Sequence, residues 1–140
     1  MNLGTLQEAE LFDMLKTSLI FDLEPRETMS KCDAYSPYYM MAIELKCRRK
    51  VYDDMLIEKS KYDFLRAHYH NRYIVSDPSG IYSFDLSLIE PAGWYPHYMP
   101  ATTDFFNHDK IVKIVGYLPK KYAINITNKL TRNESSISSL

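Results

Sequence analysis

The strongest constraint on the fold is an apolar segment in the first third of the chain. Residues 38–43 read Tyr-Tyr-Met-Met-Ala-Ile, and the segment closes in Glu44, Leu45 and Lys46. Continuous apolar runs of this kind are typical of a central strand that is covered on both faces of its sheet. We therefore predict a strand over residues 38–48 at the centre of the fold.

One helix is predicted before this strand and one after it. Residues 5–17 place Glu8 and three apolar residues at helical spacing on one face, and residues 54–69 have an apolar side and a charged side. Further strands are predicted over residues 18–23, 30–36, 72–76, 81–88 and 110–118, with a turn at residues 77–80 and an irregular stretch at residues 91–109. The order of these elements predicts an α/β fold with a central mixed sheet flanked by helices.

The composition predicts one globular domain without a membrane partner. The chain has 140 residues, of which 46% are hydrophobic, and domains typically run to about 100–200 residues. We place the domain at residues 1–127 and expect the polar, Ser-rich residues 128–140 to form a flexible tail. No apolar run approaches the ~20 residues that cross a bilayer, the N-terminus lacks the pattern of a secretory signal, and two cysteines form no disulfide framework. We therefore expect a cytoplasmic protein.

Basic residues are concentrated in the segment that follows the apolar run. The net charge of the whole chain is −1, but Lys46 to Arg72 carry eight Lys or Arg and four Asp or Glu, a local net charge of +4. Such asymmetry can steer a polyanion to one face of a protein. We expect Arg48, Arg49 and Lys50 to contact the backbone of a nucleic acid.

The residues that suggest chemistry are Asp33, Glu44 and Lys46. Alternate side chains of a strand share a face, so Glu44 and Lys46 point the same way and Leu45 points away. A turn at residues 36–37 would fold Asp33 back beside Glu44. Two adjacent carboxylates repel each other, and Mg²⁺ removes that cost because it prefers oxygen ligands, which here would include the carbonyl oxygen of Leu45. Lys46 could then orient a water molecule and stabilise charge on a phosphate, although an exposed Glu–Lys ion pair is the alternative that these residues leave open.

The same residues carry a resemblance to a known family. Asp33-Ala-Tyr, then Ala-Ile-Glu44-Leu-Lys46, then a helix that bears lysines resembles the PD-(D/E)xK nuclease superfamily, over roughly residues 5–76. The resemblance implies that Asp33 and Glu44 bind Mg²⁺, that Lys46 is the catalytic lysine, and that a restriction-endonuclease-like core contains a helix, three antiparallel strands, a second helix and a further strand. The chain departs from the pattern at Cys32, where many members have proline.

The resemblance also suggests two supporting residues. Many members have an acid on the first helix, which Glu8 matches with Glu10 as the alternative; Glu8 could equally form a capping box with Thr5. Some members have a Gln or Lys near the site on the second helix, which Lys61 matches with Lys59 as the alternative.

These observations predict a nuclease that requires Mg²⁺ or Mn²⁺ and hydrolyses phosphodiester bonds, with DNA favoured over RNA as the substrate. The short chain and its C-terminal half resemble a phage-encoded member of the superfamily. The alternative is a catalytically inactive protein of the same fold, which binds nucleic acid or serves in phage assembly. The sequence leaves open whether the protein forms a homodimer.

Overall fold

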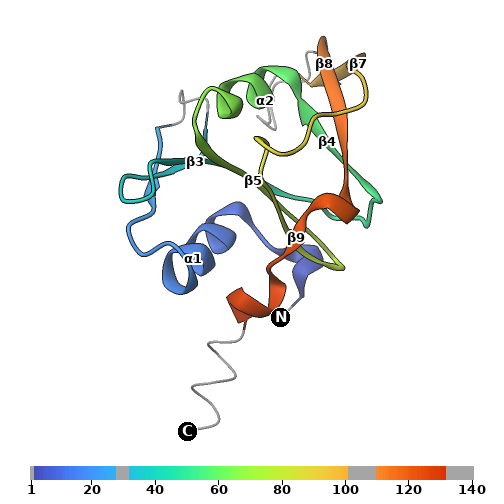
Figure 1. Ribbon diagram of the computed structural model, residues 1–140. Helices are drawn as coiled ribbons and strands as arrows, with labels where there is room; N and C mark the ends of the chain where they lie inside the picture. Colours follow the sequence, from blue (N-terminus) through green and yellow to red (C-terminus); the bar gives the residue numbers. More distant parts are fainter. Residues whose placement is uncertain (1, 28–31, 101–109, 132–140) are drawn as a thin grey trace, which may run out of the picture.

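Two β-sheets form the framework of the chain in this computed structural model, which describes residues 2–27, 32–100 and 110–131 (Figure 1). The larger sheet has the strand order β1-β2-β3-β5-β6-β9, and the smaller sheet has the order β4-β8-β7. The strands are β1 Glu24–Pro25, β2 Ala34–Ser36, β3 Met41–Cys47, β4 Asp54–Glu58, β5 His70–Asp77, β6 Gly80–Phe84, β7 Tyr95–Pro100, β8 Lys110–Pro119 and β9 Ile124–Asn125. The helices are α1 Glu8–Ser18 and α2 Lys59–Arg66, with 3-10 turns η1 Leu3–Thr5 and η2 Lys120–Tyr122. The predicted α/β class with a mixed sheet is confirmed.

Strand β3 lies at the centre of the larger sheet. It pairs antiparallel with β2 and parallel with β5, and a parallel pair requires a long crossover connection, which β4 and α2 supply here. Ile43 and Leu45 pack in one core cluster with Leu11 and Leu15 of α1, whereas Ala42 packs in a second cluster with the buried side of α2. The two helices therefore cover opposite faces of the sheet (Figure 1), as the apolar run of β3 predicts.

The predicted strand over residues 38–48 is shorter in the structure, because residues 37–40 form a turn. The side chain of Asp22 holds this turn: it accepts hydrogen bonds from Ser36 Oγ and from the N–H of Tyr38, both at 2.7 Å. Within the turn, Met40 has a φ of 50°, in the left-handed region that non-glycine residues rarely occupy. Asp22 lies far from this turn in the sequence, so the apolar run by itself could not predict the contact.

The predicted helix over residues 54–69 is wrong in its first third. Residues 54–58 form β4, and α2 begins only at Lys59. Met55 and Ile57 are two residues apart, so in a strand they share one face, and both are buried where β4 pairs with β8. Tyr69, expected on the apolar side of the helix, lies beyond its end and is 88% exposed.

The first helix begins three residues later than predicted, at Glu8. Gln7 is its N-cap residue, and the N–H of Gln7 donates to Glu10 Oε1 at 3.0 Å. Thr5 belongs instead to η1. The capping box is therefore formed by Gln7 and Glu10, and the predicted box between Thr5 and Glu8 is wrong.

Three other predicted segments need correction. Residues 18–23 do not form a strand: α1 continues to Ser18, and the N–H groups of Leu19 and Ile20 both donate to Leu15 O. Within the stretch predicted as irregular, β7 forms at Tyr95–Pro100, and residues 101–109 lie outside the described residues. The strand predicted as the last is followed by β9.

The chain continues to pack against the core beyond residue 127. Residues 127–131 are helical, and Leu130 is buried in the same core cluster as α1. The first residues of the predicted tail therefore belong to the fold, and residues 132–140 lie outside the described residues. In the described part of the chain, no helix has the length and the apolar character that a membrane span requires.

Candidate functional site

The structure brings the carboxylate of Asp33 against the backbone of β3, beside Glu44. Asp33 immediately precedes β2, and its N–H donates to Ile43 O at 3.0 Å. Its side chain in turn accepts a hydrogen bond at Oδ2 from the N–H of Leu45, at 2.8 Å. One hydrogen bond thus fixes the backbone of Asp33 and another fixes its carboxylate, next to the only acidic side chain of β3.

Glu44 is a buried carboxylate in an incompletely satisfied environment. It is 3% exposed, and its Oε2 atom has no hydrogen-bond partner among the described residues. Burial raises the pKa of Glu44 to about 8, and the adjacent Asp33 adds to this rise because its side chain favours the protonated form, against the opposing charge of Lys61. A buried oxygen without a partner is costly, and such strongly shifted groups are concentrated at functional sites.

Lys61 of α2 supplies the cation that faces Glu44. Its Nζ lies 2.9 Å from Glu44 Oε1, and its side chain is 41% exposed. Burial lowers the pKa of Lys61, but the charge of Glu44 and the hydrogen bond to it outweigh burial, so the pKa lies above its ordinary value. Lys59, the alternative, instead pairs with Asp63 at 2.7 Å on the exposed side of the helix. The structure therefore places Lys61, and not Lys59, at the site.

Glu8 and Lys46 complete the cluster of charges. The pKa of Glu8 is raised, because loss of solvation and the negative charge of Asp33 outweigh the positive charges of Lys46 and Lys61. Lys46 is half-buried, and its side chain forms no hydrogen bond or ion pair with another described residue. Since Glu10 is used in the helix cap, Glu8 is the acid of α1 that belongs to the site.

The three basic residues expected to contact a nucleic acid have different environments. Arg48 donates from Nη2 to Leu56 O at 3.3 Å. Arg49 donates from Nη1 to two backbone carbonyls of the N-terminal segment, at 3.2 and 2.9 Å. Lys50 is exposed. The two arginines thus hold neighbouring backbone, and only the lysine is left without a structural partner in the described part of the chain.

Two residues beside the cluster were not predicted. Tyr35, two residues after Asp33 on β2, packs against the same core cluster as α2. The guanidinium of Arg26 lies 4.5 Å from the centre of its ring. Strand alternation from Asp33 could have placed Tyr35 on the same face as Asp33, but the position of Arg26 could be found only from the pairing between β1 and β2.

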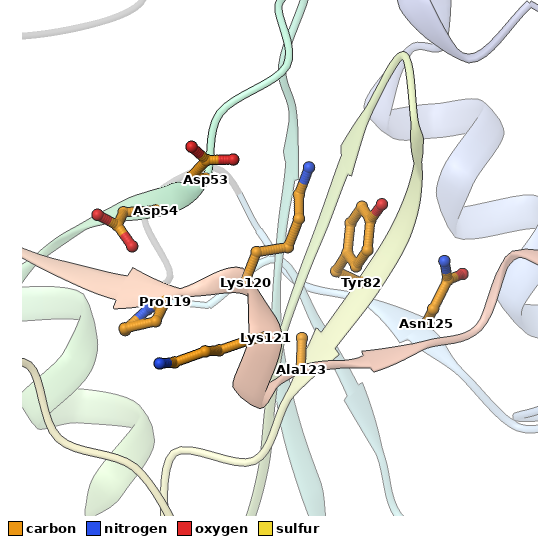
Figure 2. Close-up of a pocket in the computed structure, with 8 residues that line it drawn as sticks. All are labelled: Asp53, Asp54, Tyr82, Pro119, Lys120, Lys121, Ala123 and Asn125. Atoms are coloured by element: carbon orange, nitrogen blue, oxygen red, sulfur yellow. The ribbon is translucent and has the colours of Figure 1, made fainter.

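A separate cleft of about 660 Å³ lies between β6 and β9 of the larger sheet and the paired ends of β4 and β8 (Figure 2). It is lined by Asp53, Asp54, Tyr82, Pro119, Lys120, Lys121, Ala123 and Asn125. The ammonium group of Lys120 is already used, because it lies 2.6 Å from the buried Asp77 and 4.5 Å from the ring centre of Tyr82. This cleft is therefore a weaker candidate for chemistry than the cluster around Glu44.

No described group of three or more His, Cys, Asp or Glu side chains is arranged to hold a metal ion. The cluster offers two carboxylates, with backbone oxygen atoms beside them. Comparison of the chain with protein-family models, with curated proteins and with solved structures found no match. Any functional assignment must therefore be argued from the site itself.

Proposed function

We propose that this chain is a metal-dependent nuclease with a restriction-endonuclease-like core. The order of elements supports the proposal: α1 is followed by the antiparallel strands β1, β2 and β3, then by α2, and then by β5 parallel to β3. Strand β4 is an addition between β3 and α2. The observation that carries the proposal is the buried, partly unsatisfied Glu44, which lies beside Asp33 and 2.9 Å from the ammonium of Lys61.

The donor atoms of the cluster suit Mg²⁺ or Mn²⁺. Asp33 and Glu44 each have one oxygen with a defined partner, and Glu44 Oε2 lacks a partner among the described residues. The N–H and C=O of one strand residue point to the same side of the strand, so the carbonyl oxygen of Leu45 faces the side where its N–H meets Asp33. Two carboxylates and a carbonyl match the hard-oxygen preference of Mg²⁺, which commonly keeps several waters and needs only one or two carboxylates.

The protein side chains then have separate tasks. Lys46 has no competing partner in the described part of the chain, so its ammonium can orient the attacking water and stabilise negative charge that develops on the phosphate. Lys61 donates to Glu44 Oε1 and opposes the rise in the pKa of Glu44, so it favours the ionised carboxylate that ligation requires. Glu8, whose raised pKa reflects burial and Asp33, can accept a proton from water. A bound divalent cation would polarise the phosphate and lower the pKa of a bound water.

A cleavage assay with two matched lysine variants tests the proposal. Wild-type protein is incubated with labelled DNA and RNA in MgCl₂ or MnCl₂. Lys46→Ala and Glu44→Gln are expected to lose at least about 100-fold in rate, as is typical when a group that stabilises the transition state is removed. Lys59→Ala removes an equal charge from the exposed side of α2 and is expected to cleave at the wild-type rate. Wild-type cleavage by Lys46→Ala, or no cleavage by the wild type, would reject the proposal.

Two observations favour the alternative of an inactive nuclease-fold protein, which binds nucleic acid or serves in phage assembly. Glu44 already has a positive partner in Lys61, and three clustered metal-ligating side chains are lacking among the described residues. Titration calorimetry with MnCl₂ distinguishes the two functions. The nuclease is expected to bind Mn²⁺ and to lose this binding in Asp33→Asn, whereas the inactive protein would bind none.

A further inference from the structure

Arg26 carries an unused positive charge next to the carboxylate cluster. Its side chain is exposed and forms no ion pair with another described residue. Its guanidinium is nevertheless held in place, because it lies over the ring of Tyr35 at 4.5 Å from the ring centre, and a planar guanidinium stacks well on an aromatic face. Stacking orients the group while leaving its N–H donors at the edge free for a ligand.

Backbone pairing places Arg26 on the face that carries Asp33. Glu24 pairs with Tyr35 and Pro25 with Ala34, and the pairing continues because the N–H of Arg26 donates to Asp33 O at 2.9 Å. Residues that face each other in an antiparallel pair project from the same side of the sheet. Since neighbouring strands lie about 5 Å apart, the backbone of Arg26 is separated from that of Asp33 by a single strand spacing.

The ring of Tyr35 has its own support. His68 packs edge-on against it, with ring centres 6.5 Å apart, and the Nδ1 of His68 bonds to Phe64 O at 3.0 Å. The hydroxyl of Tyr35 has no hydrogen-bond partner in the described part of the chain. Glu24 lies opposite Tyr35 in the pairing but forms no ion pair with Arg26. Arg26 and Tyr35 together therefore present a guanidinium and a hydroxyl, and no described acid is bound to either.

We infer that Arg26 and Tyr35 form a phosphate subsite, which holds the backbone of the nucleic acid next to the bond that is cut; this inference rests on the proposed nuclease function. Arg26 supplies the charge-assisted, fork-shaped donors that suit phosphate, and the hydroxyl of Tyr35 adds a donor. Arg48 and Arg49, by contrast, donate to backbone carbonyls. The nucleic acid accordingly runs from the carboxylates toward the β1 edge of the sheet.

Equilibrium binding of DNA in EDTA tests the subsite without cleavage. The probe is a fluorescein-labelled DNA of about 20 nucleotides, used single-stranded and as a duplex, with anisotropy measured over a range of KCl concentrations. Arg26→Gln is expected to weaken binding about tenfold and to reduce the slope of log K against log salt by about one, as expected for one lost phosphate contact. Arg26→Lys should keep the slope and recover only part of the affinity, because lysine lacks the planar fork.

Lys121→Gln is the matched control. Lys121 is also an exposed cation over a tyrosine ring, at 5.1 Å from the ring centre of Tyr122, but it precedes β9 at the opposite edge of the six-stranded sheet. Its replacement removes the same charge and is expected to change affinity by less than about twofold. Equal effects of Arg26→Gln and Lys121→Gln would overturn the subsite, since they would show only the loss of net charge.

Cleavage of the same DNA with MnCl₂ separates the subsite from the proposed function. If the wild type binds and Arg26→Gln weakens binding as expected, but nothing is cleaved, the subsite stands and the nuclease proposal fails. If the wild type cleaves and Arg26→Gln binds and cleaves equally well, the subsite fails and the nuclease proposal stands. If the wild type binds neither form of the DNA at low salt, the subsite is rejected outright.

Discussion

Replacement of Glu44 by glutamine should change how the free energy of unfolding depends on pH. The amide keeps the shape of the side chain and can still accept the hydrogen bond from Lys61 Nζ. Its NH₂ group takes the place of the oxygen that lacks a partner among the described residues and can donate toward Asp33. The substitution therefore removes a buried, ionisable group and leaves the packing of β3 intact.

The magnitude follows from the pKa of Glu44, which is raised from 4.5 to about 8. Between these two values the folded protein retains a proton that the unfolded chain has released, so the stability of the wild type falls as pH rises through this window. One pKa unit corresponds to about 1.4 kcal/mol. The loss across the whole window is therefore roughly 3–5 kcal/mol, and Glu44→Gln does not incur it.

Urea unfolding in EDTA at pH 5, 6.5 and 8 measures this difference. The two proteins are expected to be equally stable at pH 5, where Glu44 is protonated, and the variant should be more stable by roughly 3 kcal/mol at pH 8. Glu90→Gln, which alters an exposed glutamate, is the control and should parallel the wild type. If the stabilities of wild type and Glu44→Gln differ by the same amount at all three pH values, the assignment of Glu44 as a proton-binding buried acid is refuted.

Other substitutions test the cap, the site and the hairpin. Glu10→Ala removes the acceptor for the N–H of Gln7 and is expected to lower stability by about 1 kcal/mol in thermal unfolding, a loss that an unchanged Tm would contradict. Glu8→Gln should leave stability within about 0.5 kcal/mol and reduce the cleavage rate about tenfold; an equal loss of stability in both variants would argue against separate roles. Burial raises the pKa of Asp77, but the hydrogen bonds from Lys120 and Ser79 and the charge of Lys120 together lower it below its ordinary value of 3.8. The ion pair therefore stabilises the fold at neutral pH, and this stabilisation is lost as pH falls below 3.8. Asp77→Asn is therefore expected to cost roughly 3 kcal/mol at pH 7 in urea unfolding, and a midpoint equal to that of the wild type would contradict this.

Local patterns in the sequence were sufficient for the centre of the fold. Continuous hydrophobicity identified β3, and strand alternation placed Glu44 and Lys46 on one face of it. The turn chemistry of residues 77–80 predicted the hairpin of β5 and β6, which is confirmed by the pairing of Asp77 with Gly80. In each case the information lies within a few residues of the element that it determines.

Features that depend on distant partners could not be predicted in this way. Met55 of β4 pairs with Leu118, far along the chain. Without that partner in view, the two-residue spacing of Met55 and Ile57 was assigned to the apolar side of the following helix. The choice between Lys59 and Lys61 depends on where α2 begins, since residues two apart on a helix point to different sides. The position of a helix start is among the least certain results of sequence reasoning. The predicted starts of both helices were a few residues too early, and this left open the choices between Glu8 and Glu10 and between Lys59 and Lys61.

The junction of β4 and α2 has a mechanical consequence. Glu58 is both the last residue of β4 and the N-cap of α2, and its side chain is tied to Lys113 of β8 at 3.0 Å. Because no residue separates the strand from the helix, the start of α2 is fixed directly to the three-stranded sheet. A displacement of that sheet relative to β3 would therefore change the distance of 2.9 Å between Lys61 Nζ and Glu44 Oε1.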